Sequence, residues 1–186
     1  MNIFVLCLNA ESCAKYHTNR HVIKMILESA QLLCGVYIKT TPETEVPYRL
    51  AASHLNHPCS IWARESLENY TWLLMLASEL CAEYTYRYGK THKTQEVIEK
   101  LLIIDPPNIP SKGRTPFAMA MPDEYRCKNA VEAYNTYYKQ EKRHLFAWKK
   151  RGMPTCLKFP FLDDIKTLSN DEHSIETTAS NKRKRK

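Results

Sequence analysis

Glycine is scarce in this sequence, with four residues among 186, whereas proline occurs ten times. Long periodic segments rich in Leu, Ala, Glu and Lys lie between the prolines, which indicates helices joined by proline-marked loops. Hydrophobic residues make up 44% of the chain, so a sizeable core can form and disorder of the whole chain is excluded. The length fits one domain.

Paired cysteines and long apolar runs are also missing. The seven cysteines are odd in number and scattered, without a C-x-x-C pair, which excludes a disulfide framework and predicts neither a zinc site nor any other metal site. The first ten residues lack the pattern of a signal peptide, and the apolar run Leu73 to Leu76 is too short to span a bilayer. These absences predict an intracellular protein without a membrane partner.

Positive charge is concentrated at the end of the chain. The net charge is +7, and Lys182 to Lys186 contribute five of these charges, which leaves +2 for the rest. Residues 166–186 therefore read as a disordered basic tail, either an arm that contacts phosphate or a nuclear import signal. A solubilising tail is the alternative. The first two interpretations place the protein near nucleic acid, in the host cytoplasm or the nucleus.

Residues 1–165 are expected to form a mainly α, single-domain bundle of about four to six helices that carries the catalytic site. A short apolar run, Ile3 to Leu8, precedes it as a buried strand or extended segment. Asn9 and Asn129 are expected N-caps, Pro58 suits a first helical position, and Gly89 should end a helix. The predicted helices span Ala10 to Gly35, Pro58 to about Tyr88, His92 to Ile103, and Ala130 to about Arg151.

A proline-rich segment runs from Asp105 to Asp123, with five prolines and one glycine. Long loops of this kind inside a compact domain are often lids or binding loops. A passive connector across one face of the bundle fits the same residues, so both interpretations stay open.

The first predicted helix carries a row of polar side chains. At 3.6 residues per turn, one narrow stripe is formed by His17, His21, Lys24, Glu28 and Gln31. Because apolar residues border this stripe on both sides, we expect it to face a cleft. The second predicted helix presents polar residues that need buried partners, namely Glu65 and Asn69.

Three chemistries fit the stripe. His17 and His21 could hold a divalent metal, but Glu28 lies too far along one straight helix to complete the site. Lys24, if desolvated among apolar side chains, could be an amine nucleophile; a structural ion pair with Glu28 is the alternative.

The third chemistry is acid–base catalysis. His17 or His21 could act as a general base oriented by Glu65 or Glu28. In that scheme, phosphate would be bound by the cations Arg20, Arg64 and Lys90.

Several blocks of the chain resemble a helical family that is common in tailed phages and large DNA viruses. The resemblance covers roughly residues 1–151, and its most specific blocks are residues 1–6, 16–28, 56–66, 83–90, 92–94 and 116–125. Members are described as uncharacterised, as pyrimidine-dimer DNA glycosylases, or as relatives of amino-acid:DNA transferases that elaborate modified thymines. The resemblance implies that the protein acts on DNA.

The sequence departs from this family at two places. Relatives carry Asp where this chain has Cys7, and Asp-Lys where it has Asn19 and Arg20. The phage endonuclease V class uses the α-amine of a small second residue, but Asn2 disfavours removal of Met1. A Schiff-base mechanism in this chain would therefore use Lys24.

Together these patterns predict a viral enzyme that modifies DNA bases, with DNA and an amino acid or other small molecule as partners and no cofactor. A pyrimidine-dimer-type glycosylase/lyase is the first alternative, and a non-catalytic helical binding module is the second. The expected catalytic residues are His17, His21, Lys24, Glu28 and Glu65. Substrate contacts are expected from Arg20, Asn56, His57, Arg64, Asn69, Lys90, His92 and Asp123.

Overall fold

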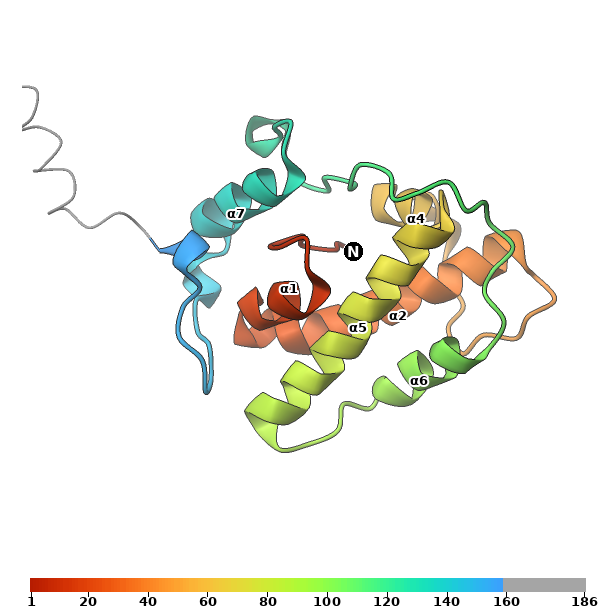
Figure 1. The fold of residues 1–186 in the computed structure, drawn as a ribbon, viewed down its shortest axis with the longest axis horizontal. Coiled ribbons are helices and arrows are strands. Elements are labelled where there is room, and N and C mark those ends of the chain that lie inside the picture. Colours follow the sequence, from red (N-terminus) through yellow and green to blue (C-terminus); the bar gives the residue numbers. More distant parts are fainter. Residues whose placement is uncertain (159–186) are drawn as a thin grey trace, which may run out of the picture. The chain divides into compact units, whose positions relative to one another are not determined.

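The computed structural model describes residues 1–158, and Met1–Pro154 form one compact unit. Within the described residues the fold is all-α, as expected, with seven α-helices and no strand (Figure 1). The helices are α1 (Ala10–Tyr16), α2 (Asn19–Thr40), α3 (Ala52–Leu55), α4 (Pro58–Ala63), α5 (Leu67–Tyr88), α6 (Gln95–Ile103) and α7 (Ala130–Glu141). The described residues also contain three 3-10 helices: η1 (Asp123–Tyr125), η2 (Arg143–Leu145) and η3 (Thr155–Leu157). The basic tail, including Lys182 to Lys186, lies outside the described residues.

The predicted first helix is in fact two helices, which corrects the expectation of one continuous element. The chain leaves helical geometry at His17, with ψ of 138°, and at Thr18, with ψ of 161°. Asn9 caps α1, as expected, because its side chain accepts a hydrogen bond from the Ser12 N–H. The side chain of Arg87 binds the carbonyl groups of Lys15 and His17 at this break, so a residue 70 positions away stabilises it.

The predicted second helix is also divided. Pro58 occupies the first turn of α4, as expected, and α4 ends at Ala63. A new helix begins after Ser66, whose side chain accepts a hydrogen bond from the Asn69 N–H. The prediction of one helix from Pro58 to Tyr88 missed this N-cap.

The helices near the C-terminus also differ in their ends from the prediction. Asn129 caps α7 as expected, through bonds from the N–H groups of Val131 and Glu132. However, α7 ends at Glu141, about ten residues before the predicted end, and η2 follows. Trp148 lies in the segment beyond, where its indole N–H donates to the Tyr16 carbonyl instead of continuing a helical face.

The apolar run at the N-terminus is buried, as expected, but it forms no strand within the described residues. Ile3 and Val5 have no exposed surface. The backbone N–H groups of Ile3 and Phe4 donate to the Asn2 side chain, and that of Leu6 donates to the Cys13 sulfur. Side chains therefore replace the neighbouring strand that this segment would otherwise need.

Helix α5 packs across both α1 and α2, and α6 lies against α5 and α2 (Figure 1). The N-terminal run passes between these helices and α7. By length and composition, α2 could cross a membrane, but 72% of its most apolar window is buried inside the protein. Core helices pass the same test, so this is weak support for a membrane span.

The proline-rich loop is fastened to the start of α5. Glu68 accepts hydrogen bonds from the Ser111 hydroxyl and from the N–H groups of Lys112 and Gly113. Asn69, which has no exposed surface, exchanges two hydrogen bonds with Thr115. The loop therefore lies along the molecule as an ordered connector.

Gly89 ends α5 in the left-handed conformation, with φ of 66°. A Cβ atom at this position would meet nothing within 4 Å, so only the backbone conformation disfavours a side chain. We expect Gly89→Ala to lower the free energy of unfolding by about 1 kcal/mol in urea denaturation. Gly152→Ala is the matched control, because its Cβ would also enter open space without a positive φ; an equal loss in both variants would contradict the reasoning.

Candidate functional site

One face of α2 carries the centre of the predicted stripe: His21, Lys24 and Glu28, at successive helical turns. His21 and Glu28 are buried, with 6% and 8% exposure, and Lys24 lies between them at the surface. The N-terminal run covers this face from one side, because Phe4 contacts His21 and Asn2 contacts Glu28. Helix α7 covers it from another through Tyr138.

Aromatic side chains enclose His21. The Phe4 ring stacks on the imidazole with 4.5 Å between ring centroids and 16° between planes. Tyr138 lies 5.2 Å from the imidazole, again between centroids. Phe4 adopts a φ of 33°, a left-handed conformation that is strained for a residue with a side chain. The strain is held by the Asn2 side chain, which accepts a hydrogen bond from the Phe4 N–H.

The Tyr138 hydroxyl links His21 to the backbone at the start of α2. The Tyr138 hydroxyl accepts a bond from the Thr18 N–H and also contacts Nδ1 of His21. Burial, followed by the positive charges of His17, Lys24, Lys142 and His144, lowers the pKa of His21 to about 3. The imidazole is therefore neutral near pH 7. The Tyr138 hydroxyl, which already accepts from the Thr18 N–H, has one proton to donate. Donation to Nδ1 of a neutral His21 would put the imidazole proton on Nε2 and make that atom a hydrogen-bond donor.

His17 occupies the break between α1 and α2 and has no exposed surface. Its Nδ1 donates to the Cys13 carbonyl over 2.7 Å, and its Nε2 is buried without a partner among the described residues. Burial lowers the pKa of His17 to about 4; the Cys13 bond opposes this effect and the charge of Arg87 adds to it. A pKa so far below neutrality makes both histidines weak bases, which argues against the expected general-base role.

Glu28 is held by two donors. One carboxylate oxygen accepts the Asn2 N–H over 2.9 Å, and the other lies 3.0 Å from the Lys24 ammonium. The Asn2 side chain is fixed in turn, because its Oδ1 lies 2.9 Å from the Tyr134 hydroxyl and its Nδ2 donates to the Ala120 carbonyl. A buried carboxylate is thus oriented by the N-terminal run beside an exposed ammonium.

Lys24 does not have the environment that the nucleophile hypothesis requires. Its side chain is 66% exposed and is paired with Glu28. This exposure keeps the ammonium solvated. The expectation of a desolvated neutral amine is therefore wrong, and the alternative of an ion pair is the arrangement found.

Glu65 and Asn69 lie elsewhere, so the predicted cleft between two polar helix faces is wrong. Glu65 precedes α5, is exposed, and accepts a hydrogen bond from the Thr115 hydroxyl. Asn69 binds Thr115 and the Trp62 carbonyl. Both side chains therefore hold the proline-rich loop.

The other predicted substrate contacts are scattered. Arg64 donates to the Leu55 carbonyl over 2.6 Å and is half-buried. His57 caps α4 and is half-buried, and burial lowers its pKa. His92 packs against Tyr84 at 5.0 Å between centroids. The remaining four predicted contacts are exposed, at Arg20, Asn56, Lys90 and Asp123.

Sequence reasoning missed the buried ion network behind the site. Arg87 has no exposed surface and donates to Glu83 over 2.6 Å, to the carbonyls of Lys15 and His17, and to the Asn19 side chain. Burial raises the pKa of Glu83, but hydrogen bonds and charges from Arg151 and Arg87 lower it more, so the net pKa is below its usual value. The spacing of Glu83 and Arg87, four residues apart on a helix, was the available signal.

Five cavities on the described surface lie away from the histidines and Glu28 on α2. These shallow cavities, of about 330 to 720 Å³, are lined by residues outside this site. Within residues 1–158, no three His, Cys, Asp or Glu side chains converge for a metal ion. The site is therefore a polar face on α2, covered by the N-terminal run and α7.

The two buried histidines predict sensitivity to acid. Their folded-state pKa values, about 4 and 3, lie below the unfolded value of 6.5, so their stabilisation is complete above pH 6.5 and is lost as the pH falls. We expect the free energy of unfolding to drop by about 1.5 kcal/mol per histidine between pH 6.5 and 5, measured in urea at each pH. His21→Gln should reduce this slope and His54→Gln, at an exposed site, should not; equal slopes in all three proteins would contradict the assignment.

Comparisons with protein-family models, curated proteins and solved structures find no match to this chain. The resemblance to the viral family therefore stays a prediction.

Proposed function

We propose that this chain is a DNA base-modifying enzyme of the amino-acid:DNA transferase type, with its reaction centre on the α2 face. The observation that carries the proposal is the combination of a buried carboxylate, a neutral imidazole donor and an exposed ammonium at Glu28, His21 and Lys24. A helical module that only binds other molecules has no need to bury Glu28 beside His21.

The three groups suit transfer of an amine. The amine nitrogen of an amino acid would attack a carbon attached to the base, and the C–N bond would form as an anionic leaving group departs with its bonding electrons. Glu28 would accept the amine proton, His21 Nε2–H would donate to the leaving group, and Lys24 would balance its charge. Each role matches the protonation and exposure described above.

The glycosylase/lyase alternative has less support. A Schiff base requires a neutral amine, but Lys24 is exposed and paired with Glu28. The two enzymatic classes therefore differ in whether the protein itself becomes attached to DNA.

Mass spectrometry of nucleosides tests the proposal. The protein is incubated with DNA whose thymine methyl groups carry a phosphate ester leaving group, with and without the twenty amino acids. The expected result is a new nucleoside only when amino acids are present, without a borohydride-trapped protein–DNA adduct. Trapping on abasic or dimer-containing DNA that is lost in Lys24→Arg would support the lyase instead. Unchanged nucleosides in every reaction, without trapping, would reject both enzymatic functions and favour the non-catalytic binding module.

A further inference from the structure

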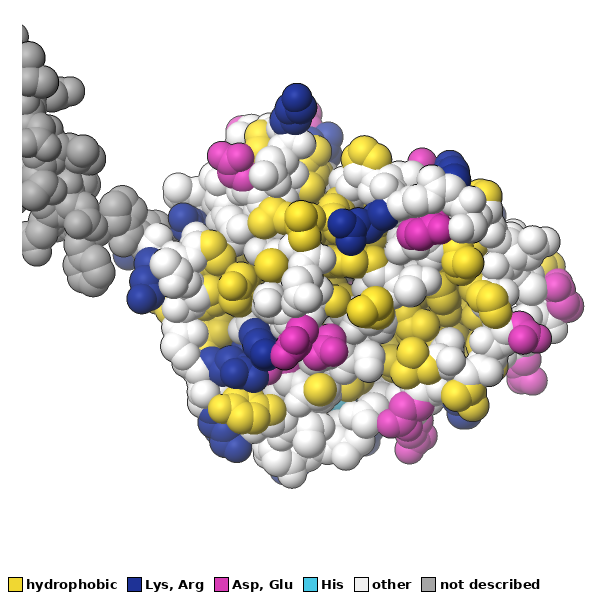
Figure 2. Space-filling model, in the orientation of Figure 1, with side chains coloured by type: hydrophobic (Ala, Val, Ile, Leu, Met, Phe, Trp, Pro, Cys, Tyr) yellow, Lys and Arg dark blue, Asp and Glu magenta, His cyan; other side chains and the backbone are white. Residues whose placement is uncertain are grey.

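Residues 147–151, called the basic strap here, connect η2 to the end of the compact unit and carry three consecutive cations, Lys149, Lys150 and Arg151. Figure 2 shows Lys and Arg side chains gathered on the side of the molecule where this segment lies beside the end of α5 (Figure 1). Nothing in the reaction proposed for the α2 face uses these cations.

The strap is fixed to two helices by its backbone. The Asn19 N–H, at the start of α2, donates to the Ala147 carbonyl, and the Lys149 N–H donates to the Asn19 side chain. The hydroxyl of Tyr86, near the end of α5, donates to the Lys150 carbonyl, and the Tyr86 carbonyl accepts from the Lys150 ammonium. The strap cations therefore project from a fixed segment, which lowers the entropy cost of binding a ligand.

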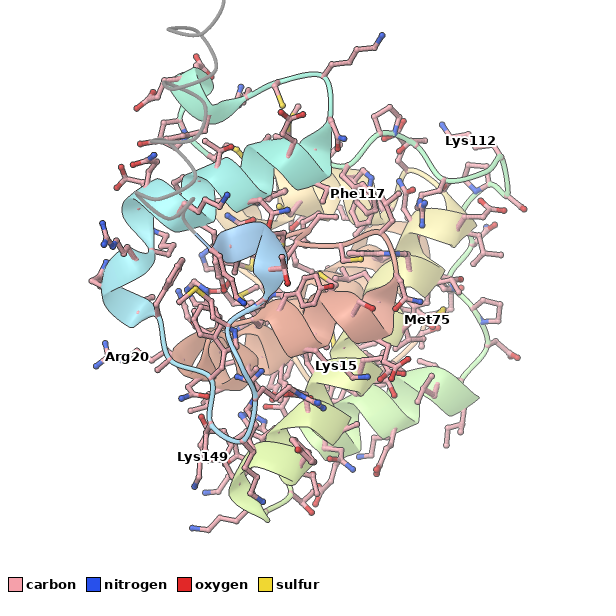
Figure 3. The ribbon with its side chains drawn as sticks, turned by 60° about the vertical axis from the view of Figure 1, so that its left-hand side comes forward. Lys15, Arg20, Met75, Lys112, Phe117 and Lys149 are labelled. Atoms are coloured by element: carbon pink, nitrogen blue, oxygen red, sulfur yellow. The ribbon has the colours of Figure 1, made fainter. Side chains whose placement is uncertain are left out.

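Within residues 1–158, two cations at this position form neither an ion pair nor a side-chain hydrogen bond. Arg151 is paired with Glu83, and Lys15 is paired with Glu11. By contrast, Arg20 and Lys149 are exposed and form no ion pair within residues 1–158. In Figure 3 their labelled side chains project outward on the same side of the molecule. Unpaired cations on one side of the molecule favour a polyanion.

Aromatic rings and a cavity accompany the cations. The Lys149 ammonium lies 5.3 Å from the Tyr88 ring centroid, and the Arg151 guanidinium lies 4.3 Å from that of Tyr86, which is 48% exposed. A cavity of about 390 Å³ beside them is lined by Lys15, Tyr16, Lys150, Arg151, Gly152 and Pro154. Cations interleaved with aromatic rings bind single-stranded nucleic acid, by contacting phosphates and stacking on bases.

We propose that the basic strap and Arg20 bind the backbone of a single-stranded nucleic acid. This inference rests on the proposed function for its direction: Arg20 and His21 are neighbours in the first turn of α2, so a strand held at the strap would lead to the reaction centre. The strap is a binding surface distinct from the reacting groups.

Fluorescence anisotropy with a labelled oligothymidylate of about twelve nucleotides tests the strap in the full-length chain. The variant is Arg20→Gln with Lys149→Gln, because neither side chain forms a hydrogen bond or ion pair among the described residues. Its matched control is Lys39→Gln with Lys100→Gln, which removes the same charge at exposed positions of α2 and α6.

The strap variant is expected to bind about tenfold more weakly at low salt. The slope of log K against log[salt] should fall in magnitude by about 1.4, since each phosphate contact on a single strand contributes about 0.7. The control should bind within about twofold of the parent. An equal loss in both variants would overturn the proposal, as would preferential binding of a duplex of the same length or of vesicles containing phosphatidylserine.

The two proposals fail separately. Weaker binding in the strap variant without any modified nucleoside would support the strap and reject the transferase. A modified nucleoside together with unchanged oligothymidylate binding in the strap variant would support the transferase and reject the strap.

Discussion

Replacing Arg87 by alanine is expected to lower the free energy of unfolding by about 3–5 kcal/mol, the range found when one partner of a buried ion pair is removed. Arg87 has no exposed surface and its guanidinium binds one carboxylate, two carbonyls and one side-chain amide. Its loss would leave the carbonyls of Lys15 and His17 buried without donors, at the point where α1 ends. Each such group costs about 1–3 kcal/mol.

Chemical denaturation of three variants separates charge from geometry. Arg87→Lys keeps the charge, but an ammonium cannot reach acceptors in as many directions as a planar guanidinium, so a loss of more than about 1.5 kcal/mol is expected. Arg20→Ala, at an exposed position, should change stability by less than about 0.5 kcal/mol. A loss below about 1 kcal/mol in Arg87→Ala would show that Arg151 alone satisfies Glu83 and that the break needs no clamp.

The stripe on α2 was predictable because helical spacing alone places His21, Lys24 and Glu28 on one face. Helix caps were predictable for a related reason: Asn9, Pro58, Gly89 and Asn129 act through their own local chemistry, and all four occupy the predicted positions. Local rules sufficed for these four caps, but the Ser66 cap and the Glu83–Arg87 pair, whose partners also lie within four residues, were missed.

The break within the first long predicted helix was not predictable from local rules. His17 and Thr18 interrupt a periodic apolar pattern that continues across them, and the interruption is stabilised by Arg87 from α5. A contact 70 residues apart leaves no mark on the local pattern. The same limit explains why the prediction paired Glu65 with the histidines. In the structure, the Glu65 carboxylate instead accepts a hydrogen bond from the Thr115 hydroxyl of the loop.

Burial was the property that sequence reasoning assigned least well. The stripe was expected to face a cleft as a unit, but Glu28 is 8% exposed while the Lys24 side chain is 66% exposed. The N-terminal run causes the difference, because Phe4 and Asn2 cover His21 and Glu28 and leave Lys24 open. Tertiary packing determines which turn of a helix is covered by a distant segment. In the proposed reaction, that packing sets which residue would be the acid, the base or the cation.

Glu28→Gln is expected to reduce turnover of the proposed transfer by about 10²-fold or more, the usual contribution of a positioned acid or base. Glutamine keeps the length and one accepting oxygen, so the bond from the Asn2 N–H can remain and the free energy of unfolding should change by less than about 1 kcal/mol. If Glu28 is the proton acceptor of the reaction, the substitution removes that acceptor and turnover falls. If Glu28 has only a structural role, turnover changes little. Comparison of turnover with stability therefore separates the two roles.

Two further variants complete the experiment on the reaction centre. Tyr138→Phe removes the hydroxyl that contacts His21 Nδ1. If that hydroxyl donates to Nδ1, the Nε2–H tautomer should lose its preference, which long-range proton–nitrogen NMR of the imidazole detects directly. Glu45→Gln, at an exposed position in another part of the chain, is the control for loss of one negative charge. Full turnover in Glu28→Gln together with an unchanged tautomer in Tyr138→Phe would reject the catalytic reading of the α2 face, because neither the proton acceptor nor the oriented donor would then matter.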